Sequence, residues 1–109
     1  MSRLKLIFTL ILLTIVAATG WASSVVAMWE TPRAVVTHPW FIATLTDTYL
    51  AFFTFWLWVA WREASVMRST LWLLLIFVTG NMAMAVYVLI ALWKLPPSAT
   101  VEDLLLRPR

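Results

Sequence analysis

Three long apolar runs constrain this chain more than any other feature of its sequence. They cover residues 6–29, 41–61 and 71–93, and Asp47 is the one charged residue within them. A helix of about 20 residues spans the roughly 30 Å of a bilayer's hydrocarbon core, so each run is long enough to cross. The sequence therefore predicts an all-α membrane protein with three transmembrane helices, at about residues 5–29, 41–61 and 70–94.

The composition supports this class and excludes a water-soluble fold. Hydrophobic residues make up 63% of the 109 residues and charged residues 12%, about half the usual charged share of a soluble domain. The length predicts a single transmembrane domain over residues 1–109. The eight basic residues stand at the ends of the apolar runs, where they contact headgroups, and form no stripe that would predict nucleic-acid binding.

The connections between the runs predict an up-down-up bundle. The segment from Arg62 to Arg68 is so short that the second and third helices must be antiparallel neighbours. Pro96 and Pro97 end the third helix. In the tail, residues 96–109, Thr100 and Asp103 have the spacing of a capping box, which predicts a short helical turn lying at the membrane interface.

The first run has two readings. Its basic start and the small residues Ala22, Ser23 and Ser24 resemble a cleaved signal peptide, but its 24 uncharged residues exceed the usual apolar region of a signal. We therefore expect a retained helix. Small residues recur four apart, as in Ala18 with Ala22 and Gly20 with Ser24, so that each pair lies on one helical face, where backbones can approach closely.

Positive charge decides the orientation only weakly under a three-span topology. Arg3, Lys5, Arg62 and Arg68 would lie on one side, and four further basic residues on the other. The first span usually dominates and its basic residues precede it, so we predict a cytoplasmic N-terminus and a C-terminus outside, in the plasma membrane or a bacterial inner membrane.

Polar residues within the spans are the candidate functional residues, because lipid cannot satisfy them. They are Asp47, Tyr49, Thr54, Asn81 and Tyr87. Equal depths in antiparallel helices predict that Thr54 pairs with Asn81, and that Asp47 faces the interior and bonds to Tyr87 or to a threonine of the first span such as Thr19.

Aromatic residues near the span ends are expected to anchor the protein at the interface. These anchors are Trp29, Trp40, Trp61, Trp72 and Trp93. We predict no cofactor and no metal site. Axial ligation of a haem or chlorophyll by His38 is an alternative, but a single imidazole before a proline favours an ordinary interfacial histidine.

Several motifs resemble an uncharacterised family of short multi-spanning membrane proteins, a domain of unknown function shared by plants and bacteria. They are His38-Pro39-Trp40, Asp47-x-Tyr49, Trp58 through Trp61-Arg62-Glu63, Gly80-Asn81 with Tyr87, and the tail from Leu95-Pro96 to Leu106-Arg107. The resemblance covers roughly three quarters of the chain, from about Trp29 onward. It implies a small helical membrane protein and supplies no activity.

Small size and the lack of a catalytic motif favour an accessory or scaffold subunit that packs against lipid and other membrane protein subunits, as in a respiratory or photosynthetic complex, and not an enzyme. A homo-oligomeric transport or proton-handling protein that uses Asp47 is the alternative. A small membrane enzyme acting on lipid or isoprenoid is a further one, and it would need Asp47 and the tyrosines to meet.

Overall fold

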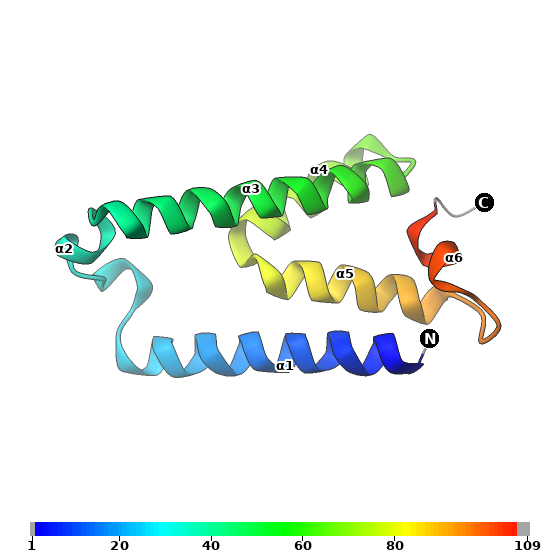
Figure 1. Cartoon of the computed structure of the whole chain (residues 1–109), viewed down its shortest axis with the longest axis horizontal. Helices are drawn as coiled ribbons and strands as arrows, with labels where there is room; N and C mark the ends of the chain where they lie inside the picture. The colour runs from blue at the N-terminus through cyan, green and yellow to red at the C-terminus, as the bar shows by residue number, and fades with distance from the viewer. Residues whose placement is uncertain (1, 107–109) are drawn as a thin grey trace.

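The protein is all-α. In a computed structural model, which describes residues 2–106, this part of the chain forms α-helices joined by short connections and contains no β-strand (Figure 1). The helices are α1 (Ser2–Val25), α2 (Arg33–Val36), α3 (Pro39–Arg62), α4 (Val66–Thr79), α5 (Asn81–Lys94) and α6 (Val101–Leu105), with a 3-10 turn at Met28–Glu30.

Two of the helices are long and apolar enough to cross a membrane. Helices α1 and α3 have 24 residues each, with mean hydropathies of 2.0 and 1.3, and each is about 36 Å long. Helix α3 begins at Pro39, which suits a first helical position because it has no N–H to satisfy. The ring of His38 caps the helix by accepting a hydrogen bond from the backbone N–H of Trp40 at 3.2 Å.

The third apolar run is not one helix, and the prediction of a continuous helix at 70–94 is wrong. The run divides at Gly80 into α4 and α5, of 14 residues each. The rings of Trp72 and Tyr87 lie 4.9 Å apart between centroids, whereas 15 residues of continuous helix would separate them by about 22 Å. The chain therefore folds back on itself, and neither helix, at about 21 Å, is long enough to cross the hydrocarbon core.

Gly80 permits this reversal because of its backbone conformation and its close neighbour. Its φ is +60° and its ψ −123°, a combination that residues with a Cβ rarely adopt. A Cβ at this position would stand 2.7 Å from Cζ of Phe52, in the middle of α3. The turn is thus packed about halfway along α3.

The reversal brings α5 back to the end of the molecule where α4 began. Both described ends of the chain lie there, next to the C-terminal end of α3 (Figure 1). The predicted up-down-up path, which placed the chain ends on opposite sides, is replaced by two long helices and a helical hairpin. Of the basic residues that the structure describes, only Arg33 lies at the other end; the rest, at the end shared by the chain ends, are Arg3, Lys5, Arg62, Arg68 and Lys94.

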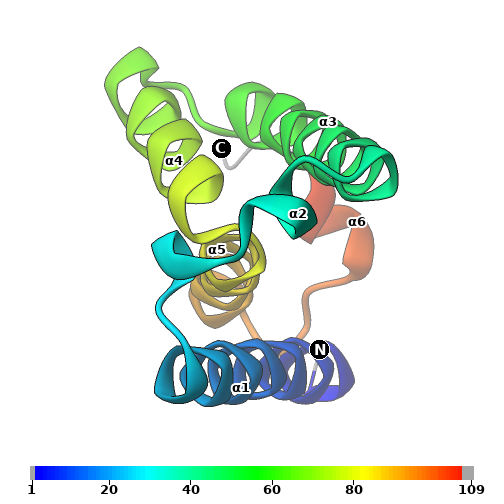
Figure 2. The ribbon, with the colours of Figure 1, turned by 90° about the vertical axis from the view of Figure 1, so that its left-hand side faces the viewer.

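The core occupies the half of the molecule that contains this hairpin. Figure 2 shows α5 between α1 on one side and α3 and α4 on the other. Buried residues from α3, α4 and α5 form one cluster: Phe52, Val59, Ile76, Ala83 and Tyr87. A second cluster joins α5 to α6 and the start of α1 through Val88, Ala91, Leu92 and Leu104, with Leu4 and Phe8 packed against it.

We predict that Gly80→Ala destabilises the fold by about 1–3 kcal/mol, because the new Cβ meets Phe52 and strains the backbone. Gly20→Ala is the matched control. A Cβ at Gly20 has no neighbour within 4 Å, so this helical substitution should be neutral or stabilise by up to about 1 kcal/mol. Thermal unfolding of both variants in detergent measures the difference, and equal stability of the two would contradict the turn.

Candidate functional site

A buried arginine forms the centre of the best-defined polar site. Arg62, the last residue of α3, is only 6% exposed. Its Nε donates a hydrogen bond to the carbonyl of Leu104 at 3.0 Å, and its Nη1 donates to the hydroxyl of Tyr87 at 3.3 Å. Arg62 therefore connects the end of α3 to α5 and to α6.

The hydroxyl of Tyr87 lies between two opposite charges. It accepts from Arg62 and donates to Oε1 of Glu63 at 3.0 Å, and Tyr87 itself is 2% exposed. Burial of a guanidinium is costly unless hydrogen bonds and an opposite charge compensate for lost water. Tyr87 and Glu63 supply that compensation.

Aromatic rings surround the phenol of Tyr87 and restrict its orientation. The rings of Phe55, Trp58 and Trp72 approach it edge-to-face, with centroids 6.2, 5.6 and 4.9 Å away. The guanidinium of Arg62 lies 6.0 Å from the ring of Trp58 and 5.7 Å from that of Tyr87, within the range of a cation–π interaction. The hydroxyl is thus held in place by packing as well as by hydrogen bonds.

The C-terminal segment closes over this site. The predicted capping box is present, since Thr100 and Asp103 exchange side-chain and backbone hydrogen bonds at the start of α6. Leu104 is buried in the core, and the carbonyl of Leu105 accepts from Nε1 of Trp58 at 3.0 Å. Helix α6 is therefore docked on the bundle.

A cavity of about 270 Å³ opens beside Arg62, between the ends of α3, α4 and α5. Its polar and aromatic lining comprises Arg62, Glu63, Arg68, Trp72, Tyr87 and Lys94. Three basic side chains and one carboxylate give this lining a surplus of two positive charges. The arrangement is suited to bind an anion.

Asp47 lies far from this cluster, which corrects the predicted pairing with Tyr87. That pairing assumed that the third helix crosses the bundle, but α5 returns, and Tyr87 lies near the Arg62 end. Asp47, eight residues after the start of α3, is exposed and makes no hydrogen bond to Thr19 or to any other part of residues 2–106. Tyr49 is 45% exposed and packs edge-to-face against Phe52 and Phe77.

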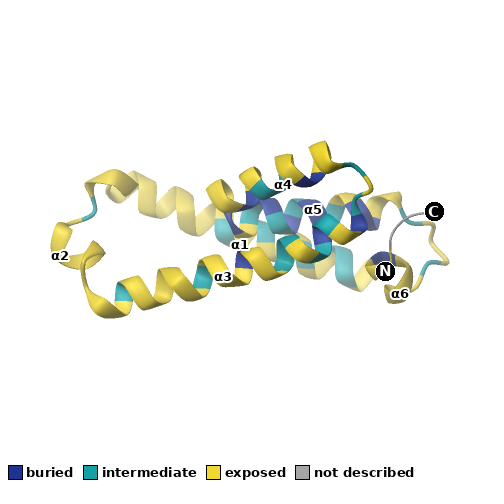
Figure 3. Cartoon of the chain, turned by 90° about the horizontal axis from the view of Figure 1, so that it is seen from above, coloured by how far each residue is buried: buried dark blue, intermediate teal, exposed yellow. Residues whose placement is uncertain are grey.

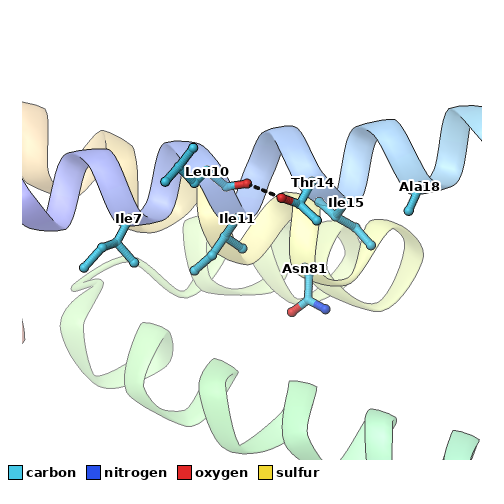
Figure 4. A pocket seen from close by; sticks show the side chains of 7 residues that line it. All are labelled: Ile7, Leu10, Ile11, Thr14, Ile15, Ala18 and Asn81. Atoms are coloured by element: carbon cyan, nitrogen blue, oxygen red, sulfur yellow. Dashed lines mark hydrogen bonds between the residues drawn. The ribbon is translucent and has the colours of Figure 1, made fainter.

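Thr54 and Asn81 do not pair either. The hydroxyl of Thr54 donates to the carbonyl of Leu50 in its own helix at 2.9 Å. Asn81 follows the reversal at Gly80 and lines an apolar groove of about 520 Å³ along α1, below Ile11, Thr14 and Ile15 (Figure 4). The two side chains turn to different faces, which equal depth alone does not determine.

The predicted anchors divide into two groups. Trp29, Trp40 and Trp93 are 71–84% exposed and Trp61 is 48% exposed, and their role as interfacial anchors stays a prediction. Trp72 is partly covered by the site around Tyr87. His38 is exposed and caps α3 through Nδ1, a structural role that the sequence pattern did not indicate.

Comparison with known families identifies the chain. The family model described as "Protein of unknown function (DUF1475)" matches residues 3–108. The chain belongs to DUF1475. No curated protein and no solved structure matches it. The DUF1475 match extends beyond the three quarters of the chain to which the motifs pointed, because it includes α1.

Three of the motifs that suggested an uncharacterised family meet at the arginine site of this DUF1475 member. The segment ending in Arg62-Glu63, Tyr87 and the tail are distant in sequence and adjacent in the fold. Sequence reasoning treated Arg62 and Glu63 as the end of a span and missed their role. The signal that could have found them is a charged pair directly after a Trp-rich helix, together with an intramembrane tyrosine.

We predict that Tyr87→Phe destabilises the protein by about 1–3 kcal/mol, because Arg62 and Glu63 both lose the hydroxyl between them. Tyr49→Phe is the matched control, since its ring contacts remain and its cost should stay within about 0.5 kcal/mol. Thermal unfolding in detergent compares the two. Equal melting temperatures would show that the hydroxyl bridge does not contribute to stability.

Proposed function

We propose that this protein is a small integral membrane subunit that is completed by a transmembrane helix of a different protein. Two spans, α1 and α3, hold it in the bilayer, and the hairpin of α4 and α5 enters from one side and returns. The observation that carries the proposal is Asp47, an exposed acid in the first half of α3, two residues before Tyr49, which contacts Phe77 of the hairpin.

The unfilled half of the bundle follows from the reversal at Gly80. Beyond the turn, α1 and α3 continue without α4 or α5 beside them. Every residue from 16 to 25 in α1 is exposed, and in the first 13 residues of α3 only Phe41 and Thr48 are partly covered (Figure 3). In a bilayer these faces contact either lipid or another polypeptide.

Asp47 favours a polypeptide over lipid. A charged residue within the hydrocarbon core costs about 2.5–3.5 kcal/mol on insertion scales, so such residues usually pair with a polar group of a neighbouring helix. The nearby hydroxyls of Thr44, Thr46 and Thr48 donate to backbone carbonyls of α3 and not to the carboxylate of Asp47. We infer a partner helix that carries a basic or hydrogen-bond-donating side chain at the depth of Asp47.

Charge favours a different protein over a second copy. Two copies that met through this face would bring two carboxylates together, which is unfavourable. The small residues Ala18 and Ala22 share one face of α1, both are exposed, and Ala18 lines the groove next to Asn81. Such residues allow a second helix to approach closely. The alternative function is a homo-oligomeric transport protein in which several copies of Asp47 line one path. That arrangement would have to overcome the repulsion between these carboxylates.

The distribution of charge sets the orientation that we propose. Arg33 alone among the described basic residues lies at the α2 end. Cytoplasmic segments carry the excess of lysine and arginine. The N-terminus and the tail therefore both face the cytoplasm, and the segment between α1 and α3 faces outward.

A photoreactive residue at Ala51, one helical turn from Asp47 and exposed, tests the partner in native membranes. We expect a crosslink to a protein of different mass. Asp47→Asn should keep it, since an amide still hydrogen-bonds, whereas Asp47→Leu should reduce it about fivefold or more, for a loss of about 1–2 kcal/mol.

The same photoreactive residue at Met67, exposed on α4, is the control and should give no crosslink that depends on Asp47. Self-crosslinking at Ala51 would favour the homo-oligomer and contradict a different partner. Equal crosslinking in the leucine and asparagine variants would remove Asp47 from the interface.

A further inference from the structure

We propose that the cavity beside Arg62 binds the phosphate group of an anionic phospholipid from the cytoplasmic leaflet. This site is separate from the face around Asp47. The inference rests on the membrane embedding proposed above but not on the partner helix. It is supported by the buried guanidinium, the charges around the cavity and the depth at which the cavity opens.

Arg62 supplies a fixed cation with unused donors. A guanidinium has five N–H groups, and the hydrogen bonds to Leu104 and Tyr87 employ two of them. No buried side-chain nitrogen or oxygen in residues 2–106 lacks a partner, so Nη2, for which no hydrogen bond is formed, is not fully buried, and Arg62 lines the cavity. A planar fork of donors on a rigid side chain matches the oxygens of a phosphate.

The other charges of the cavity complete an anion site. Arg68 in the first turn of α4 and Lys94 in the last turn of α5 are both exposed, and both line the cavity together with Arg62. Glu63 is the one acid of the lining, and its carboxylate accepts the hydroxyl of Tyr87. Its charge offsets one of three cations, which leaves a net attraction for an anion.

The position of the cavity favours a lipid headgroup over a free phosphate ion. Helix α3 is about 36 Å long, compared with the roughly 30 Å of the hydrocarbon core, so its last residue, Arg62, lies at the headgroup level. The cavity volume of about 270 Å³ equals that of about nine water molecules in the liquid, at about 30 Å³ each. This is enough for a phosphate and its ester oxygens. Ile90 adds an apolar wall, suited to the glycerol end of a lipid.

The experiment uses the full chain, purified in mild detergent with equal amounts of phosphatidylcholine and phosphatidylglycerol, with retained lipid counted by native mass spectrometry. The wild type should retain one phosphatidylglycerol in preference to phosphatidylcholine. Arg68→Gln and Lys94→Gln should each weaken this retention about fivefold. Arg3→Gln is the matched control, because Arg3 is exposed at the same end of the molecule and does not line the cavity.

Three outcomes would overturn the proposal. The first is no preference for phosphatidylglycerol in the wild type. The second is equal loss in Arg3→Gln, which would indicate general attraction to a basic surface. The third is release of the lipid by millimolar inorganic phosphate, which would assign the cavity to the free ion. Loss of the Asp47 crosslink alone leaves lipid retention unchanged, so the two proposals fail separately.

Discussion

The rest of the structure depends on the hydrogen bonds of the buried guanidinium of Arg62. Arg62 ends α3, and through two hydrogen bonds it holds α5 and the docked tail against that end. Removing one hydrogen-bond partner of a buried charged group costs about 1–3 kcal/mol or more, because that group is left desolvated and unpaired. The position of Tyr87 next to Arg62 requires α5 to return to this end, which the reversal at Gly80 allows.

The same reversal leaves half of the bundle unfilled, which is the basis of the proposed partner helix. A hairpin that turns opposite Phe52 fills only the half of the bundle around Arg62. The other halves of α1 and α3 are left with exposed small residues and an acid. One end is thus closely packed around charged groups and aromatic rings, and the residues of the other end are exposed. The two proposed interactions, with lipid at Arg62 and with a helix at Asp47, occupy these two ends.

Hydropathy predicted α1 and α3 to within a few residues, and the Thr100–Asp103 spacing predicted the capped turn of α6. It could not predict the hairpin, because a glycine in an apolar run is compatible with both a straight helix and a reversal. The difference lies in one backbone angle and its contact with Phe52. The pairings predicted for Asp47 and Thr54 were wrong because they assumed a straight third helix. Arg62, which was predicted only to end a span, is the centre of the site.

Sided labelling of single cysteines tests the fold-back most directly, since the chain contains no cysteine of its own. Ser2→Cys, Thr37→Cys and Ser98→Cys place one thiol at the start of α1, between α2 and α3, and after α5. In intact cells a membrane-impermeant maleimide should label only Thr37→Cys, and the other two should react after permeabilisation. Labelling of Ser98→Cys together with Thr37→Cys in intact cells would mean that the third apolar run crosses the membrane, and would contradict the account.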